Sequence, residues 1–304
     1  MHPAISGLWP ALLHPLTAQG ALDTAEAVAH ARTLLDAGCD GVTLFGTMGE
    51  GPAFNLAERM ALLQAMLDGG VLPEQMVVTI SAMALADAVA LGQHALAHGV
   101  QRQMLMPPFY FKQPRDAGVV QAVSEVVSGI GSADLRLVLY HFPAISMAPI
   151  SHAALAELLR LHPQQIVGIK DSSGDLEHTL SLVRTFAQLA VLVGSEAQVA
   201  PVLCAGGAGS ICGLANLAPH LMARIVAQPA QVSAADADLL ARLLALQNLQ
   251  PPMPFVALYK TLMAEQSGKP GWLRVRAPLS LLEPSEAQRV RQGYRDLGPL
   301  LQTR

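Results

Sequence analysis

IVGIKDSSGD, residues Ile166 to Asp175, is the stretch on which the interpretation of this fold depends. Four apolar residues run directly into polar turn residues, a pattern typical of a buried strand in a parallel sheet. Lys170 closes the apolar run, where a lysine has no ordinary structural reason to stand. Desolvation at a strand end disfavours the ammonium, and a neutral amine is what a Schiff-base nucleophile requires. The alternative is a lysine that reaches solvent and pairs with Asp171 or Asp175.

Short apolar runs of this kind alternate with helical patterns from the start of the chain to about residue 225. The expected strands are Gly7–Leu13, Gly41–Phe45, Met76–Ile80, Gln103–Met106, Arg136–Tyr140, Ile166–Ile169, Val191–Val193 and Gly209–Cys212. Apolar spacing at i, i+3 and i+4 predicts helices between them, at Thr24–Asp36, Leu56–Leu67, Leu85–Ala97 and His152–Leu161. Eight such alternations predict an α/β protein with a closed (β/α)8 TIM barrel, and an open doubly wound sheet is the runner-up.

Local signals mark where several of these helices begin and end. Asp23, Asn55 and Ser151 stand at N-cap positions, where a side-chain oxygen accepts from a free backbone amide. Gly38 and Gly99 stand where helices end, because glycine adopts the left-handed conformation there without strain.

After about residue 230 the pattern changes to helices only, at Ala234–Gln247, Pro254–Gln266 and Ser285–Leu297. Residues 250–254 contain three prolines and are expected to connect the first two of these helices. We therefore expect a barrel carrying the active site over residues 1–230 and a C-terminal three-helix appendage over residues 231–304.

The composition excludes several functional classes. The net charge is −4 and there is no basic stripe, which argues against a nucleic-acid partner. No apolar stretch is long enough to span a bilayer, and the N-terminus lacks a signal-peptide pattern, so we expect a cytoplasmic protein without a membrane partner. Charged residues are only 14% of the chain, which favours association between subunits.

Cysteines and histidines do not indicate a metal site or a disulfide. Cys39, Cys204 and Cys212 form neither a CxxC pair nor an even set, and we expect them to be reduced and buried. Ten histidines are scattered without HExxH or His-Cys spacing.

In a TIM barrel the chemistry gathers at the carboxyl ends of the strands. The Gly46–Gly51 turn, GTMGEG, follows the second expected strand. Its backbone amides, with the Thr47 hydroxyl, can bind a carboxylate, but for this motif taken alone a tight βα turn is the favoured explanation of the glycines. The glycine-rich segment 205–210 before the last strand can hold a phosphate or be a packing-driven connection.

Two tyrosines stand near the same mouth, Tyr140 at a strand end and Tyr110 after the fourth strand. A tyrosine facing the mouth can move a proton at the reacting carbon or the leaving oxygen, and Thr47 could link two tyrosines into a path to solvent. Packing is the simpler role for either tyrosine alone. Strand alternation points His141 away from the barrel axis, which favours a structural role.

Three ordered motifs resemble the dihydrodipicolinate synthase / N-acetylneuraminate lyase family of class I, pyruvate-dependent aldolases. They are Gly46–Glu50, Leu139–Pro143 and Gly168–Asp171, and the similarity spans nearly the whole chain. The resemblance implies that Lys170 forms a Schiff base with pyruvate or another 2-oxo acid, with no metal or organic cofactor. It also implies a homotetramer or homodimer.

The resemblance further assigns roles to individual residues. Tyr140 would be the general acid and base. Gly46, Thr47 and Met48 would hold the pyruvoyl carboxylate. Tyr110 would complete a proton relay from a neighbouring subunit. The backbone of Ile211 would lie behind the imine.

Departures from the family pattern bear on the substrate. The lysine-biosynthesis synthases have an arginine where this chain has Ile145, and an aliphatic side chain cannot replace a bidentate contact to a carboxylate. Met48 replaces a hydroxyl residue. Ser195 and Glu196 match a position where sugar-acid lyases contact substrate hydroxyls. We therefore expect a 2-keto-3-deoxy sugar acid or a related hydroxylated 2-oxo acid.

Other functions remain open on the sequence. They are a dihydrodipicolinate synthase that condenses pyruvate with aspartate semialdehyde, a sugar-acid dehydratase, a non-catalytic 2-oxo acid binding barrel, and a phosphate-binding barrel.

Overall fold

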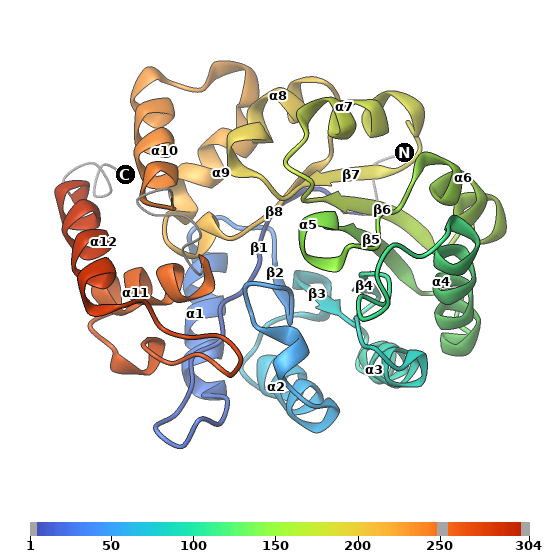
Figure 1. The fold of residues 1–304 in the computed structure, drawn as a ribbon, viewed down its shortest axis with the longest axis horizontal. Helices are drawn as coiled ribbons and strands as arrows, with labels where there is room; N and C mark the ends of the chain where they lie inside the picture. The colour runs from blue at the N-terminus through green and yellow to red at the C-terminus, as the bar shows by residue number, and fades with distance from the viewer. Residues whose placement is uncertain (1–4, 248–254, 299–304) are drawn as a thin grey trace.

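The computed structural model describes residues 5–247 and 255–298. Eight parallel strands form one sheet in the order β1-β8-β7-β6-β5-β4-β3-β2 (Figure 1). They are β1 (Gly7–Pro10), β2 (Val42–Leu44), β3 (Met76–Thr79), β4 (Arg102–Leu105), β5 (Arg136–His141), β6 (Ile166–Asp171), β7 (Ala190–Val193) and β8 (Gly209–Cys212). A parallel bridge between Ala11 and Thr43, just after β1 and within β2, closes the ring. The (β/α)8 barrel is therefore confirmed, and the open sheet is not formed.

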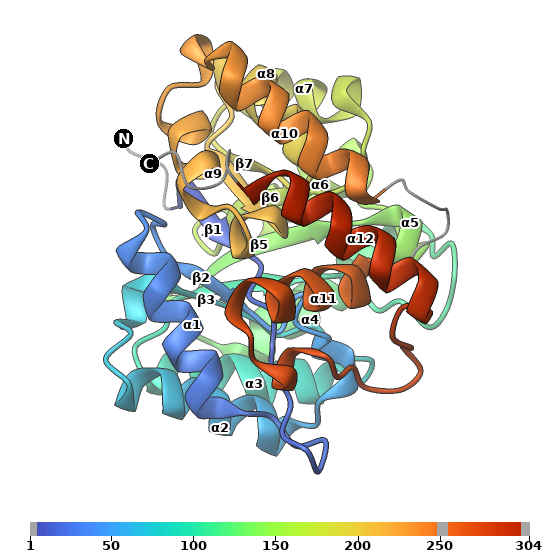
Figure 2. The same cartoon turned by 90° about the vertical axis from the view of Figure 1, so that its left-hand side faces the viewer.

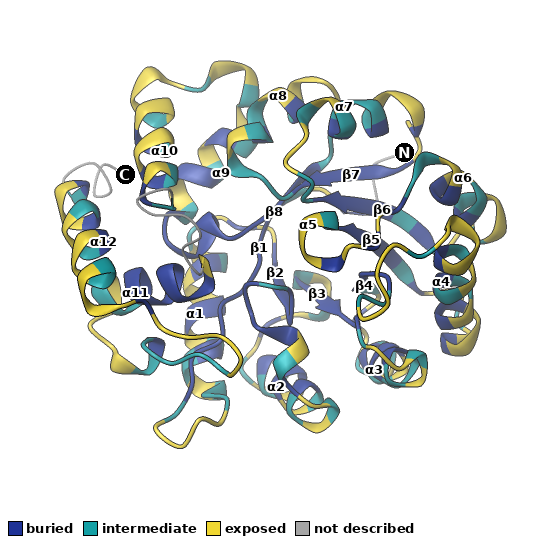
Figure 3. Cartoon of the chain, viewed as in Figure 1, coloured by how far each residue is buried: buried dark blue, intermediate teal, exposed yellow. Residues whose placement is uncertain are grey.

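Helices cover the outside of this barrel. They are α1 (Thr24–Asp36), α2 (Leu56–Asp68), α3 (Leu85–Ala97), α4 (Asp116–Ile130), α6 (His152–Leu161), α7 (Leu176–Thr185), α8 (Val199–Cys204) and α9 (Pro219–Ala227). The short helix α5 (Pro143–Ser146) directly follows β5 and lies over the carboxyl ends of the strands. Figure 3 shows most of each strand buried and the helices buried mainly on the side that faces the strands. Burial on both faces explains why the strands are apolar runs rather than alternating patterns.

The expected helix caps are present. Asp23 accepts from the amide of Glu26 at 3.1 Å, and Ser151 accepts from the amide of Ala154 at 3.0 Å. Asn55 and Glu58 form a reciprocal capping box at the start of α2. Gly38 and Gly99 follow α1 and α3 with φ of 92° and 81°, the left-handed region that glycine adopts freely. These local predictions are confirmed.

Three expectations about this region need correction. The first strand ends at Pro10 rather than Leu13. Strand β6 continues beyond Ile169 through Lys170 and Asp171, because residues of both β5 and β7 pair with these two positions. Cys204 is exposed at the end of α8, whereas Cys39 and Cys212 are buried as expected, and all three are free thiols.

Three further helices follow the barrel, α10 (Ala234–Gln247), α11 (Phe255–Ser267) and α12 (Pro284–Asp296). They lie beside one another on one side of the barrel (Figure 2). The described part of α11 starts at Phe255, and the expected start at Pro254 and the expected connector at 250–254 lie outside the described residues. Residues 256–263 of α11 are all buried, so this helix runs between α12 and the barrel rather than over its surface. Within the described ranges no helix is both long and apolar enough to cross a membrane.

Candidate active site

A cavity of about 440 Å³ opens at the carboxyl ends of the strands. Seven of the nine site residues expected from the sequence line it, namely Thr47, Met48, Tyr140, Lys170, Ser195, Glu196 and Ile211. The strand ends therefore bring together side chains that lie up to 164 positions apart, from Thr47 to Ile211.

Strand register places Tyr140 and Lys170 side by side. Tyr140 on β5 is the direct partner of Lys170 on β6, so both side chains leave the sheet on the same face. The Lys170 ammonium nitrogen, Nζ, lies 4.3 Å from the centre of the Tyr140 ring. Both residues are buried, at 4% and 3% exposure. No ion pair involving Lys170 occurs among the described residues, so its surroundings differ from those of a structural lysine.

The loop after β2 brings Thr47 to the same place. The Thr47 hydroxyl lies 3.1 Å from the Tyr140 hydroxyl, within hydrogen-bond distance. This contact connects the tyrosine beside Lys170 to the GTMGEG turn, as the proton path expected from the sequence requires. Tyr140 is therefore held by a neighbour that can pass on a proton.

The glycines of this turn are needed mainly for packing. A Cβ at Gly49 would lie 2.7 Å from the Leu12 carbonyl oxygen, and one at Gly51 would lie 1.9 Å from that of Phe45. Gly46 is different, since a Cβ there would meet its nearest neighbours at 3.9 Å. Gly46 does not line the main cavity but an adjoining one of about 70 Å³, which Thr47 and Tyr140 share. The tight-turn explanation therefore holds for Gly49 and Gly51.

Ser195 and Glu196 follow β7 on the opposite side of the cavity. One carboxylate oxygen of Glu196, Oε1, accepts from the amides of Gly213 at 3.1 Å and Leu214 at 2.9 Å. Burial raises the pKa of Glu196, and these amides and the charge of Lys170 only partly oppose that effect. Glu196 is thus a carboxylate held in place by backbone amides at the wall of the cavity.

Tyr110 lies away from this cavity. It is 73% exposed, and its ring packs edge-on against Phe111. The single chain therefore does not bring Tyr110 to Lys170. The expectation that it acts in a neighbouring subunit stays a prediction.

The second glycine-rich segment, residues 205–210, does not face the cavity. It leads into the start of β8, and therefore lies at the end of the barrel opposite the carboxyl ends of the strands. A Cβ at Gly207 would lie 2.6 Å from the Val202 side chain, and one at Gly209 would lie 2.1 Å from the Gly7 carbonyl oxygen. Close packing accounts for these glycines, which removes the support for a phosphate site there.

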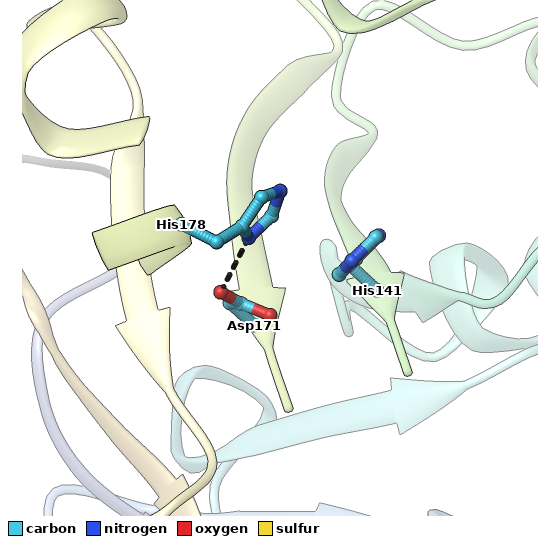
Figure 4. Close-up of side chains that lie close together, drawn as sticks. All are labelled: His141, Asp171 and His178. Atoms are coloured by element: carbon cyan, nitrogen blue, oxygen red, sulfur yellow. Dashed lines mark hydrogen bonds and ion pairs between the residues drawn. The ribbon is translucent and has the colours of Figure 1, made fainter. Parts of the chain in front are cut away.

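Behind Lys170, the next residue of β6 points to the helices and meets two histidines (Figure 4). Asp171 accepts from His178 Nδ1 at 2.9 Å and from the Thr179 hydroxyl at 2.7 Å. Burial alone would raise the pKa of Asp171, but the hydrogen bonds from His178, Thr179 and Ser173 outweigh it and hold the pKa below its usual value. His141 stacks on His178 with ring centres 4.7 Å apart, and its Nδ1 accepts from the amide of Ile150. His141 thus faces away from the cavity, as strand alternation predicts.

The ligand atoms of His141, Asp171 and His178 lie within 4.8 Å of one another, which raises the question of a metal. The two imidazole planes are only 20° apart, so their in-plane lone pairs run side by side and do not converge on one point. The carboxylate is already occupied by hydrogen-bond donors. Hydrogen bonding within the protein accounts for this cluster.

Several cavity residues were not identified from the sequence. Ser172 follows Lys170, whereas Gln247 and Tyr259 reach the cavity from α10 and α11. Glu50 in the GTMGEG turn forms a buried ion pair with Lys260 of α11. Tyr259 is one of only four tyrosines, but no local pattern indicates that a C-terminal helix faces the strand ends.

Comparison with known proteins places this geometry in a family. The model of the dihydrodipicolinate synthetase family matches residues 4–295. An uncharacterized DapA-like lyase of Chloroflexus aurantiacus is 34% identical over 95% of both chains. The crystal structure of dihydrodipicolinate synthase from Agrobacterium tumefaciens is 32% identical, covers 96% of this chain and 99% of its own, and superimposes with a TM-score of 0.88. A prophage protein of the dihydrodipicolinic acid synthase family from E. coli K12, solved with pyruvate, shares the fold at 24% identity and a TM-score of 0.86 over 97% of this chain and 98% of its own.

Proposed function

This chain belongs to the dihydrodipicolinate synthetase family, and on that premise we propose that it is a pyruvate-dependent class I aldolase or lyase. It cleaves or forms a carbon–carbon bond of a hydroxylated 2-oxo acid through a Schiff base on Lys170. The observation that supports this proposal best is Lys170 itself. It is buried, lines the cavity beside Tyr140, and has no carboxylate partner among the described residues.

The bond-making and bond-breaking steps are assigned to Lys170 and Tyr140 of this cavity. The neutral Lys170 amine attacks the C2 carbonyl of the oxo acid, and the resulting carbinolamine loses water to give an iminium. As the C3–C4 bond breaks and its electrons move into the iminium, Tyr140 takes the proton of the C4 hydroxyl and passes its own phenolic proton through Thr47 towards solvent. An aldehyde leaves. The remaining enamine is protonated at C3, and water then releases pyruvate and restores the amine.

The pyruvoyl carboxylate is placed at the loop after β2. The backbone amides of Thr47 and Met48, with the Thr47 hydroxyl, are the donors we assign to it. Ile211 lines the cavity from β8 and is assigned the place behind the imine. The pyruvate bound to the E. coli prophage protein supports this substrate class.

Ile145 argues against the lysine-biosynthesis reaction. It lies on α5 and lines an apolar cavity with Thr47, Phe255 and Leu279, so no cation from α5 meets a second carboxylate there. Arg276 also lines that cavity, but its guanidinium donates to Glu58 at 3.0 Å and stacks on Phe54. Its charge is therefore already neutralised. Glu196, Ser195 and Ser172 instead offer polar groups suited to hydroxyls.

We further propose that the enzyme is an oligomer in which Tyr110 of one subunit completes the relay of the next. The exposure of Tyr110 and Phe111, 73% and 78%, supports an interface at this loop. Sedimentation of Tyr110→Phe and of wild-type protein, each with assay of activity, checks this assignment.

Reduction with borohydride in the presence of pyruvate tests the mechanism. We expect a covalent mass increase on Lys170 in the wild-type protein and in Lys269→Arg, a change at an exposed lysine. Lys170→Arg should give none. Absence of an adduct in wild-type protein at saturating pyruvate would identify a binder rather than an enzyme. Pyruvate release or consumption with 2-keto-3-deoxy sugar acids, N-acetylneuraminate and aspartate semialdehyde then identifies the substrate, and retention of all carbons in the product would identify a dehydratase.

A further inference from the structure

The cavity has a wall that the proposed chemistry does not use. This wall comes from the C-terminal helices and shares with Lys170 the cavity of about 440 Å³. It consists of Leu244 and Gln247 of α10 and Phe255 and Tyr259 of α11. Pyruvate is too small to fill that volume. The C-terminal helices therefore border the part of the cavity where the rest of a longer substrate must lie.

Tyr259 lines this space and carries a hydroxyl. Its side chain is 3% exposed, and Gln247 donates to its oxygen at 2.7 Å. The hydroxyl proton has no acceptor in the described part of the chain. Burial and then the charge of Glu196 raise the pKa of Tyr259 well above its usual value, so the group stays protonated. Tyr259 is thus a hydrogen-bond donor held in place by an amide.

Glu196 lies close enough for its charge to act on Tyr259, and it offers the opposite function. Its Oε1 accepts from the amides of Gly213 and Leu214, and the carboxyl group as a whole lines the same cavity as an acceptor. An alcohol both accepts and donates a hydrogen bond, so it satisfies a phenol and a carboxylate together. A second carboxylate on the substrate would instead meet the charge of Glu196.

We propose that Tyr259, positioned by Gln247, binds a hydroxyl of the substrate beyond C4 and selects polyhydroxylated 2-oxo acids. The inference rests on the proposed function, because it takes Lys170 to hold the oxo-acid end. It adds a specificity-determining residue from the C-terminal helices, and it explains why these helices close the cavity.

The test compares two substrates in the full-length protein. One is 2-keto-3-deoxygluconate, which carries hydroxyls beyond C4, and the other is 4-hydroxy-2-oxopentanoate, which carries none. Tyr259→Phe removes only the phenolic oxygen. We expect kcat/KM for the first substrate to fall about 10-fold or more, mainly through KM, and that for the second to change less than about 3-fold. Gln247→Leu should shift the ratio in the same direction by a smaller factor.

Tyr294→Phe is the matched control. Its hydroxyl is also buried, has no hydrogen-bond partner among the residues that the structure describes, and lies on α12 outside the cavity, so the ratio should stay at the wild-type value. An unchanged ratio in Tyr259→Phe, an equal loss on both substrates, or a wild-type preference for the shorter oxo acid would overturn the inference. Borohydride trapping of wild-type protein with pyruvate decides the proposed function separately, because it involves neither substrate.

Discussion

Two buried lysines near the carboxyl ends of the strands have opposite surroundings. Lys170 is 4% exposed, lines the cavity, and has no ion pair among the residues described. Lys260 is fully buried, pairs with Glu50, and donates to the Arg274 carbonyl at 2.7 Å. No carboxylate pairs with the amine of Lys170 in the described part of the chain, whereas the amine of Lys260 is engaged by Glu50 and by the Arg274 carbonyl.

The difference shows that burial alone does not identify a reactive lysine. Burial lowers the pKa of Lys260, but the carboxylate of Glu50 opposes that effect and keeps the pair together. The second oxygen of Glu50 accepts from the Arg276 amide at 2.7 Å, so the ion pair fastens the chain after α11 to the GTMGEG turn. Lys260 holds the loop that we assign to carboxylate binding, and Lys170 lies where the bound substrate would be.

The largest expected effect is on the first lysine. Lys170→Arg keeps the charge but removes the nucleophile, so kcat should fall about 10⁴-fold or more. Urea unfolding should show a change of less than about 1 kcal/mol, because no ion pair is lost and a guanidinium can also lie over the Tyr140 ring. Residual activity within about 10-fold of wild type would contradict the assignment of Lys170.

The reciprocal change is Lys260→Met. It leaves the Glu50 carboxylate buried without its partner, so the free energy of unfolding should fall by about 3–5 kcal/mol. At urea concentrations too low to unfold it, the variant should still form an adduct on Lys170 when it is treated with pyruvate and borohydride. The double variant Lys260→Met/Glu50→Gln, measured by urea unfolding, should recover part of the loss. If the double variant were less stable than Lys260→Met, the ion-pair explanation would be wrong.

The neighbour of Lys170 is tested by Tyr140→Phe. Loss of the phenolic proton carrier should lower kcat roughly 10²- to 10³-fold while the lysine still forms the imine. Single-turnover trapping with borohydride separates imine formation from bond cleavage. If Tyr140→Phe slowed only the formation of the imine, the role of Tyr140 would lie in imine formation and not in bond cleavage.

The smallest effect concerns the surroundings of Lys260. His14 donates to the Gly49 carbonyl at 2.7 Å, and burial, followed by the charge of Lys260, lowers its pKa to about 3. An unfolded histidine titrates near 6.5, so below that pH the unfolded chain binds a proton at His14 that the folded protein does not bind. The contribution of neutral His14 to the free energy of unfolding is therefore fully present above pH 6.5 and is lost as the pH falls towards 3. Between pH 7.5 and 5 the contribution amounts to about 2 kcal/mol. Urea unfolding at both pH values should show that His14→Gln reduces, by this amount, the difference between the free energies of unfolding at pH 7.5 and pH 5. An undiminished difference would exclude His14 as its source.

Local patterns determined much of this protein. Apolar runs such as Ile166–Ile169 and caps such as Asn55 depend on neighbours within a few residues, so the strands, many helices and the barrel followed from the sequence. Lys170 and Tyr140 also followed, because the carboxyl ends of parallel strands must meet at one face. The boundary at residue 230 between barrel and appendage stays a prediction.

Only the tertiary structure decided which distant side chains meet. Glu50 and Lys260 are 210 positions apart, and no periodicity connects them. The same holds for Tyr259, whose place opposite Lys170 depends on how α11 packs between α12 and the barrel. Secondary structure is determined by contacts a few residues apart, whereas the wall of a cavity is determined by how whole elements pack.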